Sequence, residues 1–256
     1  MDIPLQPLAR TIENMTTANA HDSLFHGSAS DQLDRLAAAF AQPIGVPVVS
    51  VWAYTAPAVV LGCSQRLTPA IAQRAAMTRI QVCSSPAGGG AVLAGPWMLC
   101  ATVLLPPRHR LVVASLAESY RWFGLAHAAW LRRHGVEAIA TPTPLPAHGG
   151  DEEVGWACFA SVSHWEVAAG DGKIVGLAQA RRHNGVLLTS AVLLQPSPWA
   201  LLCNVMNKPL SHAATLAGRT SSCERMLGRA VDPTALMPTL WDALAGQITS
   251  EEPHAV

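Results

Sequence analysis

The chain has 256 residues, of which 50% are hydrophobic and 13% charged, and 17 basic residues balance 17 acidic ones. This composition is typical of a globular protein with a large core, and it argues against a disordered chain or a protein that coats nucleic acid. The N-terminus lacks the apolar segment of a secretory signal, and no apolar run approaches the roughly 18 residues of a membrane span. We expect a soluble, cytoplasmic protein with one main domain over residues 1–256 and with neither a nucleic-acid nor a membrane partner.

The hydrophobic periodicity predicts helices and strands that alternate without the regular spacing of βαβ units. In chain order the predicted elements are a helix over 8–42, two strands within 46–62, a helix over 69–77, a strand over 80–83, a strand pair within 91–105, a helix over 111–131, strands over 163–169, 173–182 and 185–194, and helices over 196–206 and 233–248. Thr68 followed by Pro69 is typical of a helix start. The order favours an α+β fold with a mixed, largely antiparallel β-sheet flanked by helices.

Three consecutive glycines, Gly88, Gly89 and Gly90, follow the strand predicted over 80–83. Glycine lets the backbone approach a ligand closely, and successive N–H groups in such a loop can face one carboxylate, phosphate or thioester oxygen. The spacing matches neither a P-loop nor a dinucleotide fingerprint, and a tight hairpin with a bulge explains the run equally well. The run therefore indicates a close backbone approach without identifying its ligand.

A second segment, residues 171–179, predicts a strand that begins with a lysine. Strand alternation places Lys173 and Val175 on one face and leaves the face of Gly176 and Ala178 open for close packing. A lysine that reaches inward could polarise an acyl carbonyl or hold a phosphate, whereas a lysine directly after a turn could simply be solvated.

Cys158 follows a loop rich in proline, threonine and glycine. A thiol at a loop end is accessible, and a nearby ammonium would increase its thiolate fraction, so Cys158 and Lys173 together would make an acyl-thioester site. A small buried residue is the more ordinary role of a single cysteine. The cysteines show no paired spacing of a zinc site and the histidines no metal-binding motif, so we predict no metal site.

Taken together, these segments resemble the superfamily of lipoate-protein ligase A, octanoyltransferases and biotin ligases. The order and spacing of its motifs are matched from about residue 14 to residue 195. The matching segments are Asn14-Met15, Ala58-Val59-Val60-Leu61-Gly62-Cys63-Ser64-Gln65, Gly88-Gly89-Gly90-Ala91-Val92, Cys158-Phe159, Trp165-Glu166-Val167 and Asp171-Gly172-Lys173-Ile174-Val175-Gly176-Leu177-Ala178-Gln179-Ala180-Arg181.

The resemblance implies the catalytic-domain fold of biotin and lipoate ligases, with an acyl tunnel and Lys173 in contact with the acyl carbonyl or acyl-adenylate. The residues that it places around the acyl or adenylate group are Gly88, Gly89, Gly90, Ala91, Gly176, Ala178 and Gln179. In the octanoyltransferase branch a cysteine, at the position of Cys158 in one such branch, takes the acyl group from an acyl carrier protein and passes it to a lysine of a lipoyl domain. In the ligase branch ATP and magnesium activate free lipoate, and no cysteine is required.

The chain departs from the family pattern around the glycine loop. The family usually has two arginines directly before this loop and a histidine after it, and these places hold Ser84, Ser85 and Ala94. A charge-assisted contact to phosphate typically contributes about 1.5–3 kcal/mol, so adenylate binding is weakened unless other arginines substitute. The candidates for this substitution are Arg66, Arg181 and Arg182.

The chain is also too short for the accessory C-terminal domain of many ATP-dependent ligases. We therefore predict transfer of a lipoyl or octanoyl group through Cys158, with Lys173 as the second catalytic residue and no tightly bound cofactor. ATP-dependent ligation through lipoyl-adenylate and a non-catalytic acyl-binding role are the alternatives.

Overall fold

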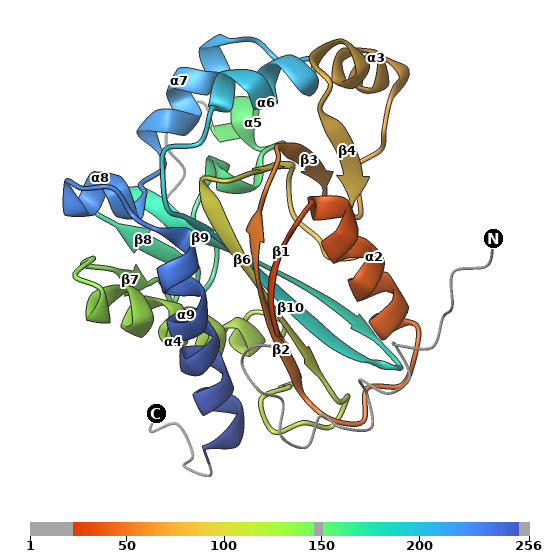
Figure 1. Cartoon of the computed structure of the whole chain (residues 1–256), viewed down its shortest axis with the longest axis vertical. Coiled ribbons are helices and arrows are strands. Elements are labelled where there is room, and N and C mark those ends of the chain that lie inside the picture. Colours follow the sequence, from red (N-terminus) through yellow and green to blue (C-terminus); the bar gives the residue numbers. More distant parts are fainter. Residues whose placement is uncertain (1–22, 146–150, 251–256) are drawn as a thin grey trace.

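The computed structural model describes residues 23–145 and 151–250, which form two β-sheets with helices around them (Figure 1). The large sheet has seven strands in the order β1-β2-β6-β10-β9-β8-β7, and the small sheet has three in the order β4-β3-β5. The strands are β1 (Leu24–Gly27), β2 (Val48–Tyr54), β3 (Ala58–Leu61), β4 (Gln81–Ser84), β5 (Val92–Ala94), β6 (Met98–Leu105), β7 (Ile139–Ala140), β8 (Val167–Ala169), β9 (Gly172–Arg182) and β10 (Gly185–Leu193).

Neighbouring strands of the large sheet are antiparallel except for the parallel pair β1 and β2. At its centre β6 is buried at every position, because it has strands on both sides and side chains packed on both faces. In the small sheet β3 is parallel to β4 and antiparallel to β5. The large sheet is thus mixed and largely antiparallel, and helices flank it, which confirms the predicted α+β class.

The helices are α2 (Ala29–Phe40), α3 (Pro69–Thr78), α4 (Arg121–Arg133), α5 (Asp151–Val154), α6 (Trp199–Val205), α7 (Ser211–Gly218), α8 (Cys223–Leu227) and α9 (Pro233–Thr249), with short 3₁₀ helices at Glu118–Tyr120 and Cys158–Ala160. Helices α2, α3, α8 and α9 begin at a capping side chain. Ser28 and Asp31 form a capping box at the start of α2. Thr68 accepts a hydrogen bond from the backbone N–H of Ile71 at the start of α3, which confirms the predicted cap.

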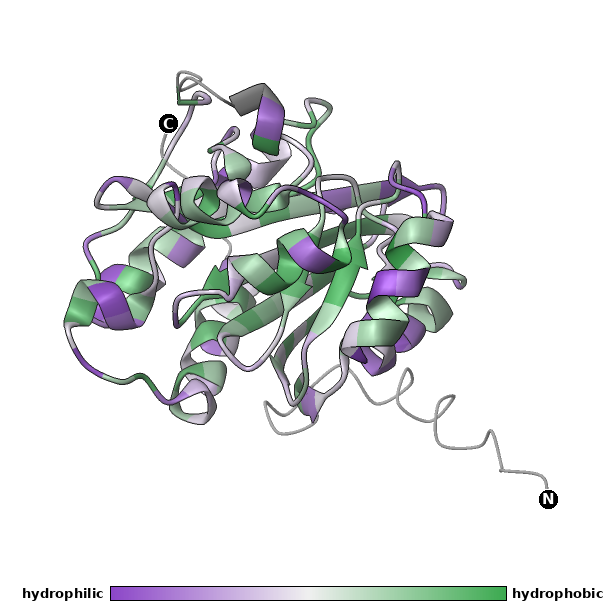
Figure 2. Cartoon of the chain, turned by 90° about the horizontal axis from the view of Figure 1, so that it is seen from above, coloured by the Kyte–Doolittle hydropathy of each residue, from purple (hydrophilic) through white to green (hydrophobic). Residues whose placement is uncertain are grey.

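Helices cover the large sheet on both faces. On one face α9 packs against β2 and β6, and α4 packs against α9, β7 and β8, in a large hydrophobic cluster. On the other face α2 packs through Leu36 and Phe40, and the small sheet with α3 and α6 forms a second cluster. Figure 2 shows hydrophobic segments concentrated in the strands between these helices. No helix within the described ranges is long and apolar enough to cross a bilayer.

One sequence-based expectation near the N-terminus is wrong and another is confirmed. The predicted helix over 8–42 is interrupted by β1, so only α2 is helical among its described residues, while residues 8–22, with Asn14-Met15, lie outside the described part. The two strands within 46–62 form, but they do not pair with each other. β2 joins the large sheet and β3 joins the small one, and this separation leaves space between the sheets.

Candidate active site

A β-bulge turns Lys173 toward the space between the two sheets. Lys173 and Val175 are two residues apart on β9 but pair with adjacent residues of β8, so Ile174 is an extra residue. This shift brings Lys173 to the side of Gly176, where its Cε lies 3.4 Å from the position that a Cβ on Gly176 would occupy. The regular alternation predicted from the sequence put Lys173 on the opposite face, and the bulge makes that prediction wrong.

The Lys173 side chain is only 2% exposed, and its ammonium is fully partnered. Nζ donates to the backbone oxygens of Cys158 at 2.6 Å and Ser161 at 3.0 Å, and it lies 2.6 Å from Oε2 of Glu166. An ammonium has three N–H groups, so each of them has an acceptor. Lys173 therefore links β9 by hydrogen bonds to the 3₁₀ helix that carries Cys158.

Glu166 is the buried counter-charge of Lys173, and its carboxylate also accepts two backbone N–H groups. Ser163 donates to Oε2 at 2.7 Å, and Leu177 donates to Oε1 at 3.0 Å. Because a buried charge is costly without partners, this set of contacts offsets the cost of burial and holds the Lys173–Glu166 pair in place. The sequence motif Trp165-Glu166-Val167 contained this residue, but sequence reasoning gave it no role.

The glycine loop rests on the backbone of the Cys158 segment. Ala91 donates to the oxygen of Trp156 at 2.8 Å and accepts from the N–H of Cys158 at 3.0 Å. A Cβ on Gly90 would come within 2.7 Å of Trp156 O and Cys158 N, so only glycine fits there. The loop is not the tight hairpin considered above, because β4 and β5 both pair with β3 and not with each other.

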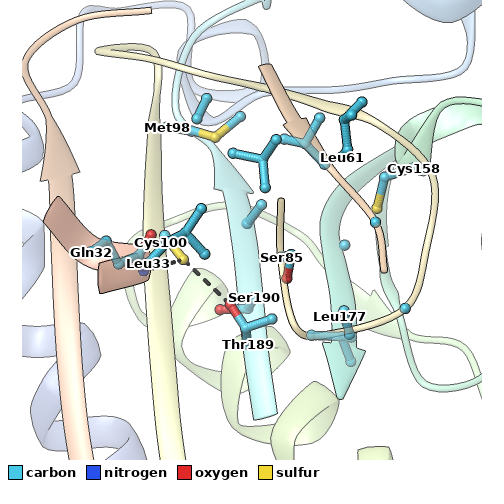
Figure 3. A pocket seen from close by; sticks show the side chains of 18 of the residues that line it. Gln32, Leu33, Leu61, Ser85, Met98, Cys100, Cys158, Leu177, Thr189 and Ser190 are labelled. Atoms are coloured by element: carbon cyan, nitrogen blue, oxygen red, sulfur yellow. Dashed lines mark hydrogen bonds between the residues drawn. The ribbon is translucent and has the colours of Figure 1, made fainter. Parts of the chain in front are cut away.

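A cavity opens between the large sheet, α2 and the small sheet, and the Cys158 side chain is part of its wall (Figure 3). Its volume is about 80 Å³, several times the roughly 10–15 Å³ that one water molecule requires. Leu61, Met98 and Leu177 are among its apolar lining residues. The cavity can therefore admit a thin, mostly apolar group beside the Cys158 thiol.

Burial raises the pKa of the Cys158 thiol, and the Glu166 carboxylate raises it further, while the Lys173 ammonium lowers it. Sγ of Cys158 lies 3.2 Å from the position of a Cβ on Gly176, so this glycine leaves room for the sulfur. The thiol is thus held neutral in the resting protein, next to a cation whose charge is already paired.

A polar cluster closes the cavity on the side away from Cys158 (Figure 3). Tyr54 donates to Oε1 of Gln32 at 2.5 Å, Gln32 Nε2 donates to Sγ of Cys100 at 3.0 Å, and Cys100 Sγ lies 3.4 Å from the hydroxyl of Thr189. Sequence reasoning missed these four residues. They come from α2, β2, β6 and β10, which are far apart in the chain, so no local motif signals them.

The structure brings only some of the predicted site residues to the cavity. Those that line it are Cys158, Gly88, Gly90, Gly176 and Ala178. Gly89 packs its backbone against Gly62, Ala91 is buried behind the loop, and Gln179 turns away to bond the oxygen of Leu116 at 2.7 Å.

Within the described part of the chain, no arginine, lysine or histidine side chain lines the cavity. Ser85 and Ala94 are on the wall where the family pattern would place charged groups. Arg66 is exposed, Arg181 bonds the segment around Ser115, and Arg182 stacks on Phe40. The described cavity lining therefore offers the phosphates of ATP no cationic side chain with which to pair. The described residues also contain no cluster of His, Cys, Asp or Glu that could hold a metal ion.

Comparisons with known proteins agree on one family. The model of the lipoyl protein ligase A/B catalytic domain matches residues 32–244. Octanoyltransferase LipM of Moorella thermoacetica is 29% identical over 152 residues, which cover 58% of this chain and 54% of that protein. The chain thus spans about half the length of this relative.

Solved structures share the fold at low sequence identity. Lipoate-protein ligase A bound with ATP gives a TM-score of 0.63 at 17% identity, over 88% of this chain and 83% of that one. Protein Ta0514 from T. acidophilum with bound lipoic acid gives 0.64 at 17%, over 88% and 82%. The bipartite lipoate protein ligase of Thermoplasma acidophilum, from work that includes its E2 lipoyl domain, gives 0.59 at 15%, over 88% and 82%. With a family model matched over most of its length, the chain belongs to the lipoyl protein ligase A/B catalytic-domain family.

Proposed function

We propose that the protein transfers a lipoyl- or octanoyl-type acyl group to a lysine of a lipoyl-domain protein through a thioester on Cys158. The observation that carries the proposal is the position of the Cys158 thiol on the wall of a mostly apolar cavity, beside Gly88 and Gly90 of the glycine loop. Each buried CH₂ group of an acyl chain contributes about 0.8 kcal/mol, so such a cavity favours the chain while the thiol meets its carbonyl end.

The chemistry follows ordinary thioester exchange. Cys158 first loses its thiol proton to solvent; the thiolate attacks the carbonyl of an incoming acyl thioester, a new C–S bond forms, and the donor leaves as its own thiolate and takes up a proton from solvent. An acceptor lysine amine then attacks the acyl-enzyme, an amide forms, the C–S bond breaks, and the proton lost by the amine returns to the released Cys158 sulfur. Each step passes through an oxyanion that needs hydrogen-bond donors.

Backbone N–H groups of the glycine loop are the available donors for this oxyanion. Among the described residues, no hydrogen bond uses the N–H of Gly88, Gly89 or Gly90. Gly88 and Gly90 also line the cavity next to Cys158. Lys173 supplies positive charge nearby and holds the Cys158 backbone, but its own N–H groups are occupied.

The partners of the proposal follow from its two half-reactions. An acyl carrier protein is the proposed donor, consistent with the relative named octanoyltransferase LipM. A lipoyl domain is the proposed acceptor, and the work on the Thermoplasma lipoate ligase includes its E2 lipoyl domain. ATP and magnesium have no role in the proposed reaction, since no cationic side chain of the described residues lines the cavity.

Intact-protein mass spectrometry tests the proposal directly. The protein is incubated with octanoyl- or lipoyl-charged acyl carrier protein, and a parallel sample receives free lipoate, ATP and magnesium. We expect a gain of one acyl group from the carrier protein, its loss in Cys158→Ala, and its transfer to an added lipoyl domain. The rate of adduct formation should rise with pH, because burial raises the pKa of the Cys158 thiol.

Cys63→Ala is the matched control, because Cys63 is an exposed free thiol that does not line the cavity. This variant should keep the full adduct. An adduct that survives Cys158→Ala, or lipoyl-adenylate formed in the ATP sample without any protein adduct, would exclude Cys158 as the nucleophile.

A further inference from the structure

The side of the cavity away from Cys158 carries a cluster of polar groups beside apolar side chains such as Leu33, although an alkyl chain end would need only apolar walls. Gln32 is 3% exposed and Tyr54 6% exposed, and both line the cavity together with Cys100 and Thr189. A buried amide is costly unless its donors and acceptor are satisfied. Figure 3 shows Gln32 and Cys100 across the cavity from Cys158, with Thr189 bonded to Cys100 and with Leu61 and Leu177 nearer to Cys158.

Tyr54 fixes the orientation of the Gln32 amide. Burial raises the pKa of Tyr54 well above its ordinary value, so its phenol stays protonated and donates to Oε1 of Gln32. The NH₂ group of Gln32 consequently points the other way, toward Cys100.

That NH₂ group has two N–H bonds, and the described residues provide one acceptor for it, the Cys100 sulfur. Thiol sulfur is a weak acceptor. A ligand atom with better acceptor properties would gain a hydrogen bond here, and the Thr189 hydroxyl offers a second donor.

We propose that this polar side of the cavity selects acyl chains whose distal end carries a hydrogen-bonding or sulfur-containing group over chains that end in a methyl group. The inference deepens the proposed function, since it takes the reactive carbonyl to lie at Cys158. Gln32 is its specificity-determining residue, held by Tyr54, and Thr189 contributes the second polar contact. A terminal hydroxyl and a cyclic disulfide are the two ligand forms that share this chemistry.

Equilibrium binding of three free acids of equal chain length tests the inference without any acyl transfer. Octanoate, ω-hydroxyoctanoate and lipoate are titrated calorimetrically into the full-length protein. A net hydrogen bond corresponds to a factor of about two to ten in affinity, so we expect one or both polar-ended acids to bind about fivefold tighter than octanoate. The hydroxy acid and lipoate arms distinguish a terminal hydroxyl from a disulfide as the preferred group.

The variant Gln32→Leu replaces the amide with an apolar group of similar size. We expect it to lose the preference and to bind octanoate at least as well as the unmodified protein. Gln42→Leu, at an exposed position just beyond α2, is the matched control and should keep the preference. If Gln32→Leu does not fold, Thr189→Val removes the second polar contact with little change of shape and should reduce the preference about twofold.

Binding that favours octanoate in the unmodified protein, equal affinity for all three acids, or no binding of any of them would overturn the inference. A preference that persists in Gln32→Leu would also contradict it. Cys158→Ala should bind the acids with the same preference, so failure to form a thioester would contradict the proposed function while leaving the ligand preference in place.

Discussion

Lys173 and Glu166 are a buried ion pair whose partners come from three segments of the chain. Lys173 bonds the backbone of the Cys158 segment, and Glu166 bonds the N–H groups of Ser163 and Leu177. The pair thus connects β8, β9 and the 3₁₀ helix that carries Cys158. In this state Lys173 is a positioning residue for the thiol, and contact of its ammonium with an acyl oxygen requires the release of one of its present acceptors.

Removal of either charge should destabilise the protein. Both side chains are nearly inaccessible, at 2% and 4% exposure, so Lys173→Met leaves Glu166 buried without its counter-charge, and Glu166→Gln does the same to Lys173. Breaking a buried pair in this way typically costs about 3–5 kcal/mol. Urea unfolding should show a loss of this size for each single variant.

The double variant Lys173→Met/Glu166→Gln should lose less than the sum of the two single losses, because no unpaired charge is left buried. Asp171→Asn, at an exposed position next to the same strand, is the control and should change the free energy of unfolding by no more than about 0.5 kcal/mol. Additive losses would show that the two side chains act independently.

At the scale of elements, the contact between the glycine loop and the Cys158 segment sets the geometry of the site. The two segments approach so closely that a Cβ on Gly90 would meet the backbone of Ala157 and Cys158 at 2.6–2.7 Å. Gly88 has no atom within 4 Å of the corresponding position, although it lines the same cavity. Two glycines of one loop are therefore under different constraints.

We expect Gly90→Ala to push the loop away from Cys158 and to reduce acyl-enzyme formation at least about tenfold, since small displacements at a reacting centre have large effects on rate. Gly88→Ala is the matched variant and should retain most of the rate, because its Cβ has open space. The measurement is the rate of adduct formation by mass spectrometry. Similar rates for the two variants would argue that the close contact at Gly90 has no part in positioning the thiol.

The same elements show how far the sequence determines the site. The resemblance of residues 88–92 and 171–181 to the family motifs implied that Gly88, Gly90 and Gly176 lie around the acyl group, and all three line the cavity, with close contacts at Gly90 and Gly176 that a larger side chain would disturb. The bulge at Ile174 was not predictable, since it depends on the register between β8 and β9 and not on the composition of either strand.

Long-range contacts account for most of the remaining differences between expectation and structure. The inner side of the cavity combines residues from α2, β2, β6 and β10, and α7 and α8 form between the helices predicted over 196–206 and 233–248, where no element was predicted. β1 formed where helical spacing was expected because it pairs with β2. Tertiary pairing overrides local preference in each case.

For the whole molecule, His127 connects stability to pH. It is fully buried on α4, where Nδ1 lies 2.7 Å from the oxygen of Phe123 and Nε2 lies 2.8 Å from the hydroxyl of Ser190 on β10. A carbonyl can only accept, so Nδ1 carries the proton and Nε2 accepts from Ser190. This neutral ring is satisfied on both sides, and burial lowers its pKa from 6.5 to about 4.

The unfolded chain binds a proton at His127 below pH 6.5, whereas the folded protein binds it only below about pH 4. Protonation therefore favours unfolding in this window, and the contribution of His127 to stability, present above pH 6.5, is lost as the pH falls toward 4. A pKa shift of this size corresponds to about 3 kcal/mol of stability.

Urea unfolding at a series of pH values should show this decrease in the free energy of unfolding. His127→Gln should flatten the pH dependence, whereas replacement of the exposed His183 by Gln should leave it unchanged. Equal pH dependence in the protein and in His127→Gln would show that acid unfolding begins elsewhere. A ligand that binds the cavity of the folded state alone should offset part of this loss of stability at low pH.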